Sequence, residues 1–173
     1  GVHVDFQDME QALQQIKEAI QKHPVSGVVG TDDLTVSLAS QIGEALGLAH
    51  NPPEAALLSR RKDLARAHLK TAGLSFVPEH LRIQLAQHKE YAENIHYPCV
   101  VKPVSLSGSR GVIRADNSQQ FNEACERISI ILSKEQQLPE EERDYVLVEE
   151  FISGPEFALE GLLNNGQLQV LAL

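Results

Sequence analysis

The sequence predicts a protein of the α/β plus α+β class, because its apolar residues change pattern along the chain. Residues 1–54 alternate helical and strand-like apolar spacing, which is typical of a parallel α/β unit. The next stretch, up to residue 77, has a helical pattern. Beyond it, short strand patterns surround one helix and end in a hairpin, which indicates a mixed α+β part with an unfinished sheet.

The first element is an amphipathic helix. Asp8 is a residue type that caps helix N-termini, and Gln11 follows it at the spacing of a capping box. Apolar residues recur at helical intervals behind this cap, so that one face of the helix is apolar. They are Met9, Leu13, Ile16 and Ile20.

A buried strand is expected next, over Val25–Val29, followed by a turn capped by aspartate. A second helix then runs to Gly47, with Leu34, Leu38 and Ile42 on its apolar face. Helix, strand and helix in this order predict that residues 1–54 form part of a parallel α/β layer.

The stretch from His50 to Gly73 reads as helical with a break near Ser59, and Gly73 takes the position after the helix end. A later helix carries its apolar residues at helical spacing, and short strands are expected around it. The helix residues are Phe121, Cys125, Ile128 and Leu132, and the strand segments are 74–83, 99–104, 111–115 and 145–151.

Two connections in the C-terminal half have a predictable character. Glu135–Asp144 is rich in charge and contains a proline, so it is expected to be an exposed surface loop. Asn164, Asn165 and Gly166 predict a tight hairpin turn, because such a turn requires positive φ angles.

The composition excludes some partners. A formal charge of −9 over 173 residues repels nucleic acid and anionic membranes at long range, so an anionic ligand needs a local positive cluster. No apolar run approaches membrane-spanning length. Cys99 and Cys125 form no CxxC pair, so a reduced, cytoplasmic setting is the simplest interpretation, although a disulfide remains open.

Lys102 interrupts an apolar strand and is followed by the loop "SLSGSRG". Taken alone, Lys102 is compatible with an edge-strand lysine that reaches solvent. The loop glycines, Gly108 and Gly111, allow backbone N–H groups to turn toward an anion, and the neighbouring serines add hydroxyl donors. A strand-borne cation below such a loop indicates a phosphate site with a mobile flap, although a flexible hairpin tip has a similar composition.

A second segment, "VLVEEFISGPEF", is suited to the rest of a nucleotide. A buried strand runs into Glu149 and Glu150, and backbone groups at Phe151 and Ile152 are free to read an adenine edge. Glu156 follows a Gly-Pro turn at a distance suited to two ribose hydroxyls. The alternative for this segment is a solvated acidic turn.

Together, "RRKDLARAHLKTAGL", "YPCVVKP", the "SGSRG" loop and "VLVEEFISGPEF" resemble the ATP-grasp superfamily of carboxylate–amine ligases, with a leaning toward amino-acid and dipeptide ligases. The resemblance implies a division into the end of a pre-ATP-grasp α/β domain, a helical bridge, a lid subdomain and the start of the C-terminal subdomain. The ranges are 1–54, 55–77, 78–147 and 148–173.

The resemblance also implies residue roles. Lys62 and Lys102 take the places of the two phosphate-binding lysines, and Lys102 and Arg110 are the candidate catalytic residues. The alternative for Lys62 is a surface lysine paired with a nearby acid. The remaining candidates bind the nucleotide through the flap, the adenine edge or the ribose. They are Ser107, Gly108, Ser109, Gly111, Glu149, Glu150, Phe151, Ile152 and Glu156.

The reaction implied is ATP-dependent joining of a small-molecule carboxylate to an amine through an acyl phosphate, with release of ADP and phosphate. ATP and Mg²⁺ are the expected cofactors, with no metal ligand assigned here because the family's ligands follow the hairpin, so the sequence reads as part of a longer enzyme. Homo-oligomers are common in the family, and that state stays open. A non-catalytic adenine-nucleotide-binding or regulatory module and a plain protein-binding scaffold remain the alternatives.

Overall fold

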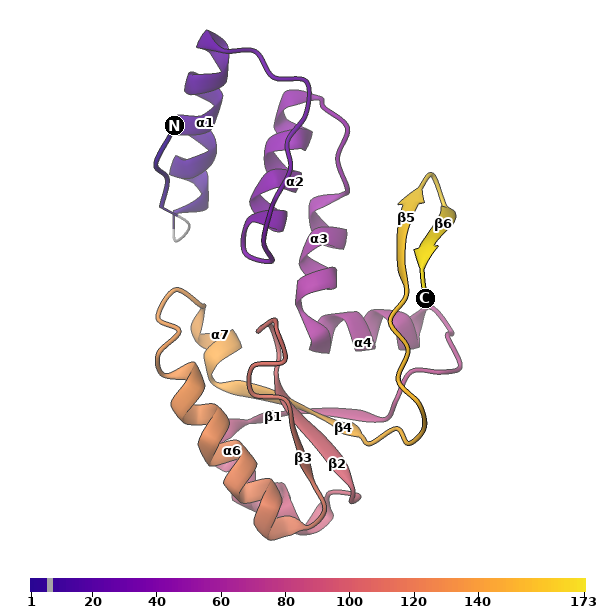
Figure 1. The fold of residues 1–173 in the computed structure, drawn as a ribbon. Helices are drawn as coiled ribbons and strands as arrows, with labels where there is room; N and C mark the ends of the chain where they lie inside the picture. The colour runs from indigo at the N-terminus through magenta and orange to yellow at the C-terminus, as the bar shows by residue number, and fades with distance from the viewer. Residues whose placement is uncertain (6–7) are drawn as a thin grey trace.

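The computed structural model describes residues 1–5 and 8–173 and divides into an upper helical part, a lower sheet part and a projecting hairpin (Figure 1). No helix within these described residues is long and apolar enough to cross a bilayer. The helices are α1 (Met9–Lys22), α2 (Thr35–Leu46), α3 (Pro53–Arg60), α4 (Lys62–Thr71), α5 (His88–Tyr91), α6 (Ser118–Leu132) and α7 (Glu140–Arg143), with short 3-10 helices at Leu85–Gln87 and Ala92–Asn94. The strands are β1 (His80–Gln84), β2 (Cys99–Pro103), β3 (Ile113–Ala115), β4 (Tyr145–Glu150), β5 (Glu160–Asn164) and β6 (Gln167–Ala172).

The two N-terminal helices confirm the sequence prediction. Asp8 caps α1, since its Oδ1 accepts a hydrogen bond of 3.0 Å from the backbone N–H of Gln11. Helix α2 ends at Gly47, whose φ of 65° is the left-handed conformation that glycine adopts without strain.

The prediction of a strand at Val25–Val29 is wrong. These residues lie in an irregular connection between α1 and α2, and the side chain of Val29 is 83% exposed. A strand is stable only when a neighbouring strand completes its hydrogen bonds, and no strand in the described part of the chain pairs with this segment. The apolar run therefore forms no parallel layer here, and both sheets in the described residues are antiparallel.

The helical pattern predicted for this stretch is confirmed as α3 and α4, and the break predicted near Ser59 lies at Arg61. Arg61 is extended, with φ −89° and ψ 99°, so the chain changes direction between the two helices (Figure 1). Gly73 has a φ of 79° directly after α4, as predicted for the position after a helix end.

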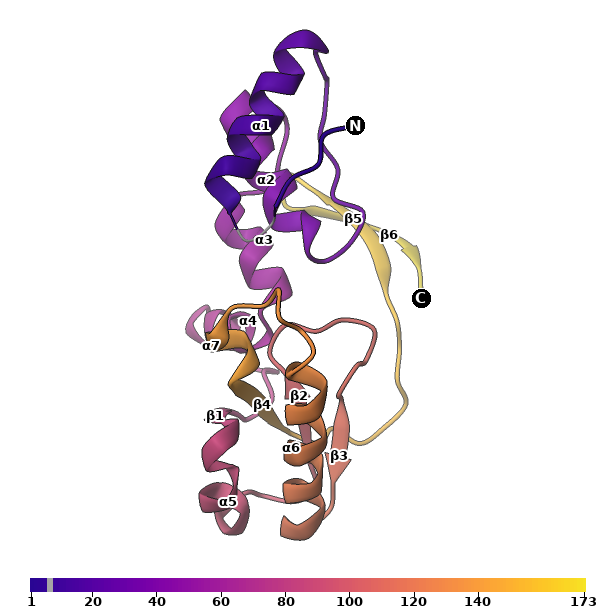
Figure 2. The same cartoon turned by 90° about the vertical axis from the view of Figure 1, so that its left-hand side faces the viewer.

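The lower part is a four-stranded antiparallel sheet in the order β1-β4-β2-β3 with α6 packed on one face (Figure 2). The predicted helix and the strands predicted over 99–104, 111–115 and 145–151 are confirmed, whereas the strand predicted over 74–83 begins only at His80. Alternate residues of β2 face the core beneath α6, where the side chains of Cys99 and Val101 are buried. Val100 and Lys102 therefore lie on the opposite face, toward α4. The largest core side chains around α6 are those of Phe121, Ile128, Leu132 and Ile83.

The predicted exposed loop at Glu135–Asp144 is partly wrong, because it contains α7 and a buried carboxylate. Pro139 stands at the N-terminal end of α7, where a missing N–H costs nothing. The side chain of Glu142 is buried because its Oε1 accepts a hydrogen bond of 2.5 Å from Arg60, a residue far away in the sequence. The sequence gives no sign of this partner.

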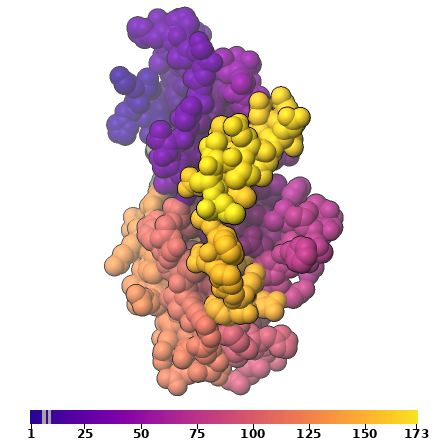
Figure 3. Space-filling model, turned by 45° about the vertical axis from the view of Figure 1, so that its right-hand side comes forward, coloured from indigo at the N-terminus to yellow at the C-terminus, as the bar shows by residue number. Residues whose placement is uncertain are grey.

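The predicted hairpin is confirmed by β5 and β6, which pair in antiparallel register around Asn165 and Gly166. Both turn residues have positive φ, 49° and 76°. Every residue of the two strands is exposed, and an extended segment carries the hairpin away from the sheet along the outside of the molecule (Figure 3).

We predict that neither cysteine reacts with a thiol reagent while the protein is folded. Both are free and buried in the core, and burial raises the pKa of Cys99 to about 11 and that of Cys125 to about 12. The thiolate, which is the reactive form, is therefore scarce at about pH 8. Peptide mass spectrometry of the labelled protein should find both residues unmodified before unfolding in guanidinium and modified after it. Rapid labelling of the folded protein at either residue contradicts the prediction.

Candidate functional site

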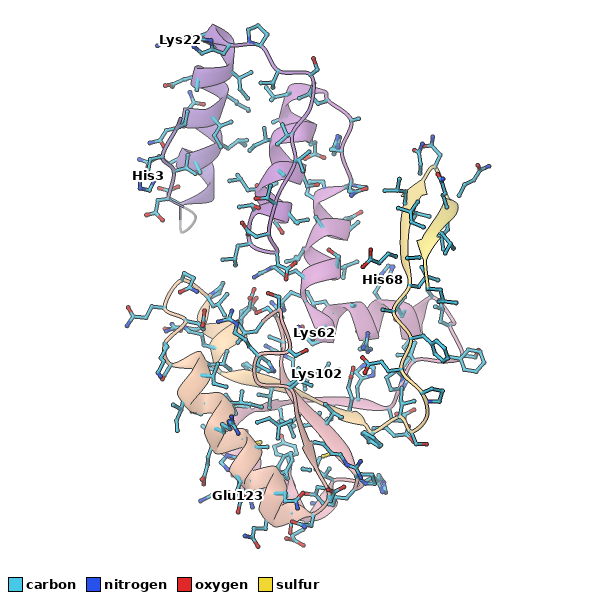
Figure 4. The ribbon with its side chains drawn as sticks, viewed as in Figure 1. His3, Lys22, Lys62, His68, Lys102 and Glu123 are labelled. Atoms are coloured by element: carbon cyan, nitrogen blue, oxygen red, sulfur yellow. The ribbon has the colours of Figure 1, made fainter. Side chains whose placement is uncertain are left out.

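Lys102 lies on an interior strand of the sheet, because β2 pairs with both β4 and β3; Lys102 itself stands opposite Leu147 of β4, one residue beyond the pairing with β3. The side chain is only 15% exposed, and its Nζ forms an ion pair with Glu149. The solvent-reaching alternative for this lysine is therefore wrong. Figure 4 places Lys102 and Lys62 where α3 and α4 meet the sheet.

Strand register brings the two partners together. Glu149 of β4 stands opposite Val100 of β2, so it shares a face with Val100 and is a diagonal neighbour of Lys102. The carboxylate is buried and accepts from two cations, Lys102 at Oε2 and the Nε of Arg66 at Oε1 over 2.6 Å. This arrangement fixes the direction of both cationic side chains on the face toward α4.

Lys62 is the first residue of α4 and is attached to the loop after β2. Its backbone N–H donates to the carbonyl of Val104 over 2.8 Å, and its Nζ donates to the carbonyl of Leu106 over 2.6 Å. Burial, followed by the nearby charge of Lys102, lowers the pKa of Lys62. An anion between the two lysines would relieve this repulsion. Pairing with a surface acid, the alternative for Lys62, is not what the structure shows.

Two cavities meet at Lys102. The first, about 670 Å³, lies between α4, the segment 74–78 and the end of β4, and its size suits a small ligand. The second, about 350 Å³, lies beneath the "SLSGSRG" loop. Lys102 lines both, so one ligand lying across it would place one end in each cavity.

The loop has the backbone shape expected for a flap. Gly108 and Ser109 both have positive φ, 62° and 56°, and the carbonyl of Ser107 accepts the N–H of Arg110 at 3.3 Å. Within the described part of the chain, the N–H groups of Gly108 and Ser109 have no hydrogen-bond partner. Two unpaired amides at the rim of the second cavity are available to an anion.

Most of the sequence-predicted site residues lie at these two cavities, and three lie outside both. Arg110 is half-exposed and donates to Glu135 over 2.7 Å, Gly111 packs behind the flap against Pro103, and Glu156 is exposed in the segment before the hairpin. The first cavity is lined by Lys102, Glu149, Glu150, Phe151 and Ile152, and the second by Lys62, Lys102, Ser107, Gly108 and Ser109.

Sequence reasoning missed Arg66 and Asp33. Arg66 lines the first cavity and holds Glu149, and its position four residues after Lys62 on one helix was the available signal, because such residues share a face. Asp33 lines the second cavity from the turn before α2. No local pattern could have placed it there, because the contact depends on how the helical part sits over the flap.

Comparisons with known proteins find one family model and several ligases that resemble this chain. Residues 95–173 match the family model described as ATP-grasp domain. Dapdiamide A synthase of Enterobacter agglomerans is 26% identical over 157 residues, which cover 90% of this chain and 36% of that protein.

Solved structures of ligases also resemble this chain. The L-amino acid ligase of Bacillus licheniformis has 29% sequence identity and a TM-score of 0.78, with 96% of this chain and 39% of that chain covered. D-Alanine-D-alanine ligase of Helicobacter pylori has 19% identity and a TM-score of 0.56, with 83% and 41% covered, and is similar in fold. The chain spans less than half the length of these relatives.

We predict that Glu149→Ala lowers the free energy of unfolding by about 1–3 kcal/mol, because two partly buried cations lose their shared acceptor. Chemical denaturation of the full-length protein measures this. The matched control is Glu79→Ala, which removes a carboxylate from an exposed pair with Lys70 at 3.5 Å and should change stability much less. Equal effects of the two substitutions contradict the structural role of Glu149.

Proposed function

We propose that the protein is an ATP-dependent carboxylate–amine ligase, because residues 95–173 match the family model described as ATP-grasp domain and the similar L-amino acid ligase has 29% sequence identity. In the proposed reaction a carboxylate attacks the γ-phosphate of ATP, and ADP leaves an acyl phosphate. An amine then attacks the acyl carbon, and phosphate departs. The described residues supply the nucleotide-binding part of this machinery.

The observation that carries the proposal is the position of Lys102 between two cavities of different character. The first cavity is bordered by the end of β4, where Phe151 and Ile152 leave the sheet, and we assign it to adenine. The second lies under a loop with unpaired amides and contains Lys62, and we assign it to the phosphates. A bound ATP would then extend over Lys102 from one cavity to the other, and the ammonium group of Lys102 would contact the phosphate chain.

Each residue has a physical task in this proposal. Lys62, Lys102 and the amides of Gly108 and Ser109 offset the charge of the transferring phosphoryl group, which is the main contribution proteins make to such reactions. The backbone after Glu150 reads the adenine edge, while the Glu149 side chain holds Lys102 in line. Arg110 and Glu156 lie outside both cavities, so their proposed roles require the flap and the segment after β4 to close over the nucleotide.

Mg²⁺ would neutralise phosphate charge when bound beside ATP. Within residues 1–5 and 8–173, no group of three His, Cys, Asp or Glu side chains is placed to hold a metal ion. We assign no magnesium ligand among these residues, and no step above depends on one.

Amino acids are the substrates we propose, because two similar proteins are named dapdiamide A synthase and L-amino acid ligase. Within this proposal residues 1–54 end a pre-ATP-grasp domain, 55–77 form the bridge, 78–147 the lid and 148–173 the start of the C-terminal subdomain. A cytoplasmic location suits an enzyme that uses ATP and keeps its cysteines reduced.

We predict that Lys102→Met lowers the affinity for ATP by about one to two orders of magnitude, because charge-assisted hydrogen bonds to phosphate are lost. Isothermal titration of the full-length protein measures the change. Lys89→Met removes a 73% exposed lysine on the far side of the sheet and serves as the control with unchanged affinity. Equal affinities of Lys102→Met and the unmodified protein would remove the assigned nucleotide site.

The proposed activity is tested by ADP release from ATP and Mg²⁺ in the presence of pairs of amino acids, with the joined product identified by mass spectrometry. Release should require two amino acids and should fall sharply in Lys102→Met. Tight ATP binding without ADP release for any pair of acid and amine would favour the non-catalytic nucleotide-binding module. Absence of ATP binding would favour the scaffold alternative.

A further inference from the structure

We propose that Arg61 is a positioning residue for Lys62, acting through a buried ionic cluster that fixes the start of α4 against the lid. This inference rests on the proposed function, because it concerns how Lys62 is presented to the phosphates. The Arg61 cluster is defined as Arg60, Arg61, Asp63, Arg82, Glu141 and Glu142.

The centre of the cluster is a bidentate ion pair between Arg61 and Asp63, the residues directly before and after Lys62. Arg61 donates from Nε and a terminal nitrogen to the two oxygens of Asp63, over 2.9 and 2.8 Å, and both side chains are buried. The planar guanidinium holds a carboxylate in one orientation in this geometry. The residues before and after Lys62 are therefore fixed to each other, and Lys62 is fixed between them.

The other residues of the cluster attach the connection between α3 and α4 to the lid. Arg61 also donates to Glu141 of α7 over 2.8 Å, and Arg60 donates to the buried Glu142 of the same helix over 2.5 Å. The Nε of Arg82 in β1 pairs with Oδ2 of Asp63 at 3.2 Å, the oxygen that also accepts from Arg61. The α3–α4 joint is thereby held to α7 and β1, which belong to the domain that carries Lys102.

Lys62 has two hydrogen bonds of its own, to the carbonyls of Val104 and Leu106, but the larger electrostatic effects around it oppose its charge. It is the first residue of a helix, where the positive end of the helix dipole disfavours a cation. The charge of Lys102 lies nearby, and burial removes solvent. Without the cluster, rotation of the first turn of α4 would allow the ammonium group to reach water.

The charges of the cluster balance, with three arginines against three carboxylates. Its effect on a phosphate ligand is therefore positional rather than a general attraction. The cluster could affect ATP binding through its charge or through the position of Lys62. If only charge matters, removing a negative charge should strengthen ATP binding. If the position of Lys62 matters, the same change should weaken ATP binding. Asp63→Asn separates the two.

The experiment measures ATP and AMP affinity of the full-length protein by titration calorimetry for Arg61→Lys and Asp63→Asn. AMP lacks the outer phosphates that Lys62 is proposed to hold. Each variant should bind ATP about tenfold more weakly while AMP affinity changes less than about twofold. In a Lys62→Ala background the same substitutions should change ATP affinity less than about twofold, because the group they position is gone.

Controls cover charge and folding. Glu126→Gln, an exposed carboxylate on α6, makes the same charge change as Asp63→Asn and should leave both affinities unchanged. If a central variant does not fold, Glu141→Ala removes one acceptor of Arg61 from a side chain that is 64% exposed, and it should give a smaller loss in the same direction.

The outcomes separate the two proposals. Parallel loss of ATP and AMP affinity, tighter ATP binding in Asp63→Asn, or the same loss in the Lys62→Ala background overturns the positioning role but leaves the proposed function intact. If the unmodified protein binds neither nucleotide, the proposed function fails and the positioning role fails with it.

Discussion

The buried carboxylate of Glu149 between Lys102 and Arg66 is the interaction on which the site depends. Two cations on one face of a sheet and a facing helix repel each other and attract water, so they stay in place only when an acceptor lies between them. Strand register supplies that acceptor, because Glu149 is the diagonal neighbour of Lys102. The same carboxylate joins α4 to β4 and so keeps the wall of the first cavity in place.

A consequence is that acceptors within the protein already satisfy part of the positive charge of the site. Lys102 is paired with Glu149, and the Lys62 ammonium donates to the carbonyl of Leu106. An incoming phosphate has to share or replace these acceptors, so the net gain on binding is smaller than the number of cations implies. Under the proposed function this arrangement favours a highly charged ligand, because a weak acceptor cannot compete with a carboxylate that is already in place.

Sequence reasoning succeeded where the cause is local and failed where it is distant. The hairpin at Asn165 and Gly166, the cap at Asp8 and the alternation around Lys102 follow from neighbouring residues. The strand at Val25–Val29 failed because a strand exists only with a partner, which an apolar run cannot reveal. The candidate site was predictable at Lys62 and Lys102, but not the ionic cluster that surrounds Lys62, because its members come from four separate elements.

The hairpin of β5 and β6 has a practical consequence. Its leucines and valine are exposed, and its outer backbone groups have no strand beside them in the described structure. A ribbon of this kind is a template for edge-to-edge aggregation, and an isolated hairpin has little stability of its own in water. Soluble expression of residues 1–173 alone therefore calls for a covering partner or a charged substitution such as Leu163→Lys on this ribbon.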